Sequence, residues 1–249
     1  MPSKQVTDRS RSAGIVGTNA ETYATEVGAR TSAQLAPFLE AGESVPDAAL
    51  LLRLLARFLA SKSTALDAAD SAHEAEISDD AAPRAERDEA EVEARETVTE
   101  FRNAVSAKYG DVGLHTLGIY EPPPRGAPEL AKYGRALHVT LIDARRTLTS
   151  SGRRGVNLDR AEMAAELLPV VERLEAALRV VAQEASELHL TQTAKDRAFE
   201  ENDRAFGTVA RVAEGLLALA GRGDLADRVR PSRRRPGVTE AEEVSPTEG

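Results

Sequence analysis

The chain contains no cysteine, and aromatic residues make up only 4% of its 249 residues. Without cysteine it has no disulfide framework, no thiolate nucleophile and no thiolate-bound zinc or iron–sulfur cluster. The scarcity of aromatic residues argues against a platform on which nucleic-acid bases stack. Long apolar runs are also missing: none exceeds five residues, whereas a membrane-spanning helix needs about 20.

The N-terminal residues include basic side chains but no apolar segment of the kind that signal peptides carry. With no spanning segment either, the sequence predicts a cytoplasmic protein. Its hydrophobic fraction of 41% is too high for a chain that is disordered throughout. Alanine and arginine are abundant and favour helices, although a GC-rich, bacterial-like coding composition gives the same bias.

Charge is distributed unevenly along the chain, whose net charge is −9. Residues 67–100 contain 13 acids and three bases, so this stretch holds the whole negative excess. Such an imbalance favours a solvated helical segment or a basic partner, and it disfavours contact between this stretch and DNA phosphates.

Apolar residues recur every three to four positions over most of the chain, which is typical of helices. We therefore predict an all-α fold: an elongated four-helix bundle, packed like a coiled coil, made of two long αα-hairpins. The predicted segments are a largely disordered N-terminal arm with room for a short helix (1–43), a first hairpin with its turn at 77–83 (44–110), a Gly/Pro-rich crossover loop (111–127), a second hairpin plus a short C-terminal helix (128–230), and a disordered tail (231–249).

The first long helix has two features that permit different interpretations. Leu51, Phe58 and Leu59 belong to an apolar stripe with helical spacing, which we assign to the core together with Leu55 and Leu66. Residues 48–62 also carry Arg53, Arg57 and Lys62 but no acid, the pattern expected of a helix on anionic lipid. A core helix gives the same pattern far more often, and we adopt that interpretation.

Two segments are candidates for binding a partner. In the central loop, apolar side chains could dock a partner or could equally fold onto the bundle as a crossover strap. Near the C-terminus, five arginines fall within eight residues. The candidate residues are Leu114, Leu117, Ile119 and Tyr120 in the loop, and Arg228, Arg230, Arg233, Arg234 and Arg235 near the C-terminus.

The arginine cluster could contact nucleic acid, an acidic partner, or the acidic stretch of this same chain. Four glutamates follow it and offset much of its field: Glu240, Glu242, Glu243 and Glu248. A nucleic-acid footprint usually needs a broader basic face, so we do not expect nucleic acid to be the partner.

Sequence motifs of catalysis and of cofactor binding are absent. The chain has no Gly-x-Ser-x-Gly, no His-Glu-x-x-His and no phosphate-binding Gly-x-x-x-x-Gly-Lys-[Ser/Thr]. Asp70, His73 and Glu74 share one helical face and could hold a divalent ion, but a solvated acidic helix end has the same sequence. We predict no catalysis, no cofactor and no metal.

These observations favour a non-catalytic interaction or scaffold protein that binds protein partners of unknown identity and associates with itself. The alternative is a ligand- or metal-binding bundle, with or without enzymatic activity, that has a polar site between its helices. Candidates for that site are His73, His138 and Asn202.

Overall fold

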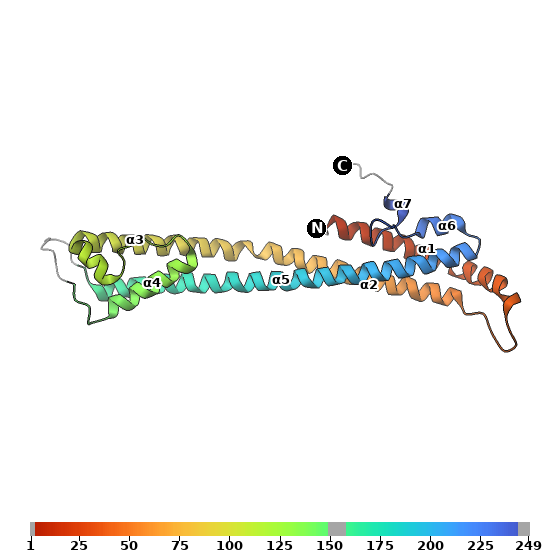
Figure 1. Ribbon diagram of the computed structural model, residues 1–249, viewed down its shortest axis with the longest axis horizontal. Coiled ribbons are helices and arrows are strands. Elements are labelled where there is room, and N and C mark those ends of the chain that lie inside the picture. The colour runs from red at the N-terminus through yellow and green to blue at the C-terminus, as the bar shows by residue number, and fades with distance from the viewer. Residues whose placement is uncertain (1–2, 149–157, 244–249) are drawn as a thin grey trace. The chain divides into compact units, whose positions relative to one another are not determined.

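The computed structural model describes residues 3–148 and 158–243, and helices account for most of these residues (Figure 1). The same residues contain no strand, only an isolated antiparallel bridge between Pro231 and Thr239. The prediction of an all-α fold is therefore confirmed. In chain order the elements are α1 (Lys4–Leu35), the 3-10 turn η1 (Ala36–Phe38), α2 (Ala48–Asp79), α3 (Ala81–Leu117), α4 (Ala127–Ile142), α5 (Arg160–Leu219), α6 (Gly223–Val229) and α7 (Glu240–Glu243).

The chain divides into two units, each built around apolar side chains of its own. Unit 1 comprises Met1–Ala75 with His189–Gly249, and unit 2 comprises Glu76–Leu188. The core of unit 1 lies among α1, α2 and the later part of α5, with α6 packed against it. The core of unit 2 lies among α3, α4 and the earlier part of α5. In the described residues each unit thus has three main core helices, and the four-helix bundle is not confirmed.

Helix α1 fills most of the arm (1–43) that the sequence predicts to be largely disordered. Its buried row consists of small side chains at helical spacing, including Val16 and Ala20, which pack in the core of unit 1. Packing against α2 is close, because a Cβ at Gly28 would lie 2.8 Å from the Cβ of Ala49. The prediction is wrong because small side chains give a weak apolar signal in sequence, although they are often fully buried in folded proteins.

Helix α2 buries only part of the predicted row of side chains. Leu52, Leu59 and Leu66 are fully buried at seven-residue intervals. Leu51 and Phe58, which we assigned to the core, are instead 44% and 47% exposed. Both rows have helical spacing, so the sequence pattern does not say which of them faces α1 and α5.

The core row of α2 continues into polar side chains that are bonded within unit 1. Asp70 is fully buried, 2.6 Å from Lys195 Nζ, and it accepts a 2.8 Å hydrogen bond from the Ser3 backbone N–H. His73 is also buried, and its Nδ1 lies 3.1 Å from Thr191 Oγ1. Burial raises the pKa of Asp70, but the bonds from Lys195 and Ser3 outweigh burial and hold that pKa below its usual value.

The turn predicted at 77–83 is absent. Helix α2 ends at Asp79 and α3 begins at Ala81, and Asp80 between them keeps helical dihedral angles (φ −66°, ψ −17°). Pro83 lies in the first turn of α3, where a missing N–H leaves no helical hydrogen bond unmade. The predicted first hairpin requires the chain to reverse at these residues. The helical backbone at Asp80 makes no such reversal.

Helix α3 extends into the predicted crossover loop (111–127). Gly110 leaves the helical region with φ 63°, but the helix resumes and ends at Leu117, followed by Gly118 at φ 71°. Both glycines adopt left-handed angles that other residues rarely adopt. The connection to α4 is thereby reduced to residues 118–126.

Unit 2 combines apolar packing with ion pairs between its helices. Gly134 of α4 lies so close to α5 that a Cβ there would contact Val171 at 2.5 Å. Arg173 of α5 binds Glu86 and Glu93 of α3 at 2.9 and 2.6 Å, which neutralises part of the acidic stretch.

Among the helices in the described residues, we find none with the length and apolar character needed to cross a membrane.

The two rows of α2 predict different responses to truncation. We expect Leu59→Ala to lower the free energy of unfolding by about 3 kcal/mol, because it leaves a cavity in the core of unit 1. We expect Phe58→Ala to cost less than about 1 kcal/mol, since that ring is half exposed. Urea denaturation followed by circular dichroism measures both. Equal losses would contradict this assignment of the rows.

The buried carboxylate of Asp70 predicts a pH dependence. Because its pKa lies below the ordinary 3.8, the unfolded chain takes up this proton more readily than the folded chain. The stabilisation is therefore complete above about pH 4 and is lost as the pH falls through the folded-state pKa.

We expect Asp70→Asn to lower the free energy of unfolding at neutral pH by about 3 kcal/mol, because Lys195 keeps its burial and loses its anion. The variant should also show a shallower loss of stability on acidification than the wild type. Asp67→Asn, on an exposed residue of the same helix, is the matched control. Denaturation at a series of pH values provides the test, and an unchanged acid dependence in Asp70→Asn would refute it.

Candidate functional site

The C-terminal segment is folded where the sequence predicts a disordered tail (231–249). An antiparallel bridge between Pro231 and Thr239 closes the loop 231–239. We call residues 230–243, which also include α7, the C-terminal strap. The last part of the predicted tail, 244–249, lies outside the described residues.

Side chains of α1 attach the C-terminal strap to unit 1. Ser12 Oγ accepts a hydrogen bond of 3.2 Å from the Thr239 N–H, and the Ser12 hydroxyl donates to the Glu242 carboxylate. Arg235 forms an ion pair of 3.2 Å with Asp8. These contacts give the strap a fixed position beside α1.

A glycine permits the closest approach of the strap to α5. Gly237 has φ 77°, and a Cβ at this position would overlap the carboxylate of Asp203 and contact Arg9. Any other residue would therefore be strained by its backbone angle and would also displace the Arg9–Asp203 pair.

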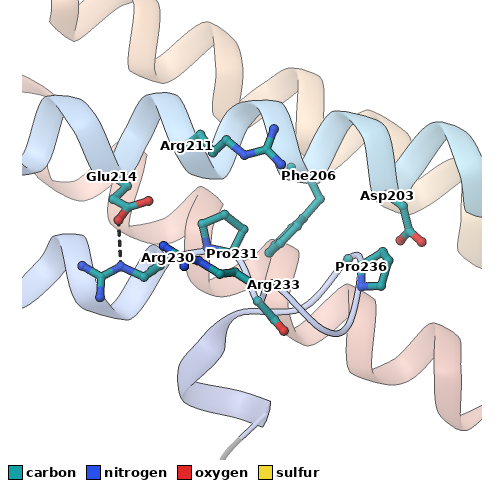
Figure 2. Close-up of a pocket in the computed structure, with 11 residues that line it drawn as sticks. Asp203, Phe206, Arg211, Glu214, Arg230, Pro231, Arg233 and Pro236 are labelled. Carbon is teal, nitrogen blue, oxygen red and sulfur yellow. Dashed lines mark hydrogen bonds and ion pairs between the residues drawn. The ribbon is translucent and has the colours of Figure 1, made fainter.

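A pocket of about 580 Å³ lies between α5 and the strap (Figure 2). The fully buried ring of Phe206 projects from α5 toward the strap, where Pro231 and Pro236 line the opposite wall. Gly207, next to Phe206 on α5, contributes no side chain and leaves this part of the pocket open. The interior surface is therefore partly apolar.

Both acids that line the pocket are bound by arginines. Asp203 accepts hydrogen bonds from Nε and Nη2 of Arg9 at 2.7 and 2.9 Å. Glu214 accepts one from Arg230 Nε at 2.8 Å (Figure 2). This bond is the main cause that raises the pKa of Arg230, so its guanidinium remains charged. Arg230 also pairs with Asp227 at 2.7 Å and with Glu240 at 3.9 Å.

Two more arginines line the same pocket, Arg211 from α5 and Arg233 from the strap. Both are exposed, and neither side chain has a carboxylate partner among the described residues. Figure 2 shows the Arg211 guanidinium beside Phe206, above the pocket. A guanidinium binds a carboxylate or phosphate through two parallel hydrogen bonds, so this pair is suited to an anionic group.

The structure places the central-loop candidates mostly in a core. Leu114, Leu117 and Ile119 are buried in unit 2, so their side chains are not accessible to a partner. Tyr120 is exposed and stacks on His115, with ring centroids 4.0 Å apart. Leu114 and Leu117 belong to α3, and only Ile119 and Tyr120 lie in the connection to α4.

The five arginine candidates occupy different environments. Arg233 lines the pocket as an exposed cation, whereas Arg230 lines it as the partner of Glu214. Arg228 and Arg234 are exposed, and Arg235 is paired with Asp8 on α1. Of the five, only Arg230 and Arg233 line the pocket, Arg230 paired with Glu214 and Arg233 without an ion pair to a described residue.

The predicted metal candidates have other partners. Asp70 and His73 bond to residues of α5 inside unit 1, as described above. Carboxylate oxygens of Glu76, Glu184 and Glu187 instead lie within 4.8 Å of one another in unit 2. Burial and the neighbouring negative charges raise the pKa of Glu76. Acidic groups like this one are common without an ion, and they support no metal assignment.

The residues proposed for an internal polar site do not form one. Asn202 and His73 are buried in unit 1, whereas His138 is half-buried on α4 of unit 2. The amide of Asn202 makes no hydrogen bond to a described residue. A buried asparagine of this kind in a helical core more often fixes the register of the helices than binds a ligand.

Sequence reasoning missed the part of the pocket that α5 provides. Phe206 appears in the sequence only as a member of a core stripe, and Arg211 as an ordinary surface residue. Gly207 and Arg211 lie four residues apart, which places them on one helical face, but nothing in the sequence indicates that the C-terminal segment covers this face.

Comparison with known proteins found no match: no family model, no curated protein and no solved structure resembles this chain.

Two glycines test the fixed position of the strap. We expect Gly237→Ala to lower the free energy of unfolding by more than about 1 kcal/mol, because of its positive φ and its overlap with Asp203. We expect Gly215→Ala to raise it by about 0.5–1 kcal/mol, since that helical position has open space around its Cβ. Amide hydrogen exchange in residues 230–243 should accelerate in the first variant only. A strap that exchanges equally in both would contradict the structure.

Proposed function

We propose that this chain is a non-catalytic interaction protein that binds an acidic segment of a partner protein in the pocket between α5 and the C-terminal strap. One observation carries the proposal: the pocket's acids are bound by arginines, while Arg211 and Arg233 have no carboxylate among the described residues. The pocket thus presents two guanidinium groups that form no ion pair with a described residue.

Because Arg211 and Arg233 both carry guanidinium groups, the pocket favours a ligand with carboxylate groups. Arginine remains charged under all physiological conditions, and its planar guanidinium presents paired donors to a carboxylate. Two exposed arginines of the strap region, Arg228 and Arg234, add positive charge to the same unit. Extra cations attract a segment with several acids more strongly than a single acid.

The apolar part of the pocket favours a peptide over a bare inorganic ion. Pro231 and Pro236 offer apolar contact next to the arginines. The volume of about 580 Å³ lies in the range of sites that hold small molecules or a few amino-acid residues. A segment with an acidic and an apolar side chain therefore matches both surfaces.

The pocket chemistry supports binding without catalysis. Its described lining contains no histidine and no lysine, and its hydroxyl group belongs to Ser232. Ser232 Oγ accepts hydrogen bonds from the backbone N–H groups of Arg234 and Arg235 at 3.1 and 3.0 Å. A hydroxyl that already accepts these two bonds within the turn of the strap is poorly placed to act as a nucleophile.

A second copy of the chain is one source of the acidic segment. Glu89 and Glu96 of α3 belong to the acidic stretch and have largely solvent-facing side chains. Binding of that stretch would make the chain self-associate, as the sequence predicts. Light scattering distinguishes this source from a different protein, because only self-association raises the molar mass of the purified chain with concentration.

The test uses a fluorescein-labelled peptide that alternates glutamate and leucine, with fluorescence anisotropy as the readout. We expect the full chain to bind this peptide and to bind the glutamine version at least about tenfold more weakly, because the charge-assisted hydrogen bonds are lost. The variant Arg211→Gln/Arg233→Gln should lose about tenfold or more in affinity for the glutamate peptide.

The matched control is Arg145→Gln/Arg179→Gln, which removes two exposed arginines of unit 2. It changes the net charge equally and should leave the affinity within about twofold of wild type. Equal binding of the two peptides, or an equal loss in the control variant, would show that general charge rather than this pocket attracts the peptide.

A further inference from the structure

Helix α2 has a second apolar surface that faces away from the core of unit 1. Leu50, Leu51, Leu54 and Phe58 are between 44% and 50% exposed. With about 3.6 residues per turn, these four side chains fall on one half of the helix, away from Leu52. We call them the α2 ridge.

Basic side chains accompany the ridge along α2. From Ala48 to Leu66 the helix contains Arg53, Arg57 and Lys62 and no aspartate or glutamate. Helical spacing places the two arginines along one edge of the ridge and the lysine along the other. Long basic side chains at the edges of an apolar face can keep their charges in a polar layer while their stems follow the apolar surface.

Helix α5 adds to this surface next to Phe58. A shallow pocket is lined by Phe58, Lys62, Glu201 and Arg204. Its acid, Glu201, is bonded at 2.9 Å to Lys62 and at 3.0 Å to Arg197 on its own helix. Arg204 is exposed and has no carboxylate partner among the described residues. Arg204 therefore adds a cation next to Phe58, whereas the acids nearest the ridge lie at its ends: Asp47 accepts a bond from the Leu50 N–H, and Glu21 and Asp67 share a pocket lining with Arg57.

The charge around the ridge decides between its potential occupants. Two copies packed ridge to ridge would bring Arg53 and Arg57 close to the same residues of the second copy, and such like-charge contacts are unfavourable. An anionic bilayer offers what the ridge lacks: acyl chains for the leucines and Phe58, and negative headgroups for the cations. The α2 ridge projects from a single helix, and a protein partner would need a groove of matching shape to bind it. Lipid acyl chains are fluid and need no such groove.

We propose that the α2 ridge docks unit 1 on an anionic membrane surface, with α2 lying in the plane of the headgroups. The apolar side chains enter the boundary between headgroups and acyl chains, and Arg53, Arg57 and Arg204 contact lipid phosphates. This site is separate from the pocket between α5 and the C-terminal strap and does not depend on its function.

The test is co-sedimentation of the full chain with sucrose-loaded vesicles. One set contains only phosphatidylcholine, and the other contains phosphatidylcholine and phosphatidylglycerol at about seven to three, which gives a strongly negative surface. We expect binding to the anionic vesicles at low salt, at least about tenfold weaker binding to the neutral vesicles, and release as the salt concentration rises.

Variants separate the ridge from other surfaces. Leu54→Ser/Phe58→Ser should lower binding to the anionic vesicles at least about tenfold, because each serine removes apolar contact with the acyl region. Val139→Ser/Ile142→Ser removes two comparably exposed apolar side chains from α4 and should bind as wild type does. Circular dichroism confirms that each variant is folded.

Arg211→Gln/Arg233→Gln should also bind these vesicles as wild type does, because its substitutions lie outside the ridge. The proposal is overturned if wild type stays in the supernatant with anionic vesicles, or if either control loses binding as the ridge variant does. It is also overturned if the ridge variant sediments normally but loses self-association in light scattering, since the occupant is then a second copy.

Discussion

The apolar row of α5 is the surface on which both cores depend. Its earlier part places Leu167 and Val171 in the core of unit 2, and its later part places Val209 and Ala213 in the core of unit 1. Because each core has three main helices in the described residues, α5 supplies a large share of the buried surface in each. Phe206 belongs to this row and also lines the pocket, so core packing fixes one wall of the candidate site.

Pairing of charges determines where this molecule can bind an anion. Many arginines form an ion pair with a neighbouring carboxylate, as Arg230 does with Glu214. A guanidinium in such a pair has fewer N–H donors left for a ligand. Arg211 and Arg233 differ because the nearest acids of the pocket are already bound elsewhere. The buried pair of Asp70 and Lys195 follows the same logic: its charges satisfy each other inside unit 1 and stabilise the fold rather than a ligand.

The sequence predicted the elements whose signal is local. Helical spacing of apolar residues gave the all-α class, and two residues of the predicted core stripe, Leu59 and Leu66, are fully buried. The arginine cluster was recognised, and Arg233 lines the pocket. The signal failed for α1, whose buried side chains are mostly small, and at Asp80, where acids and a nearby proline are typical of a turn but are equally compatible with a continuing helical backbone.

By itself, then, the sequence determined that this chain forms long helices, concentrates its acids in one stretch and carries a basic C-terminal cluster. Only the tertiary structure decided which side of α2 is buried, since the rows containing Leu52 and Phe58 have the same periodicity and only packing against α1 and α5 distinguishes them. It also decided the site. Arg211 and Arg233 are distant in sequence, and they share a pocket because the strap folds back over α5, held by contacts such as that between Ser12 and Thr239.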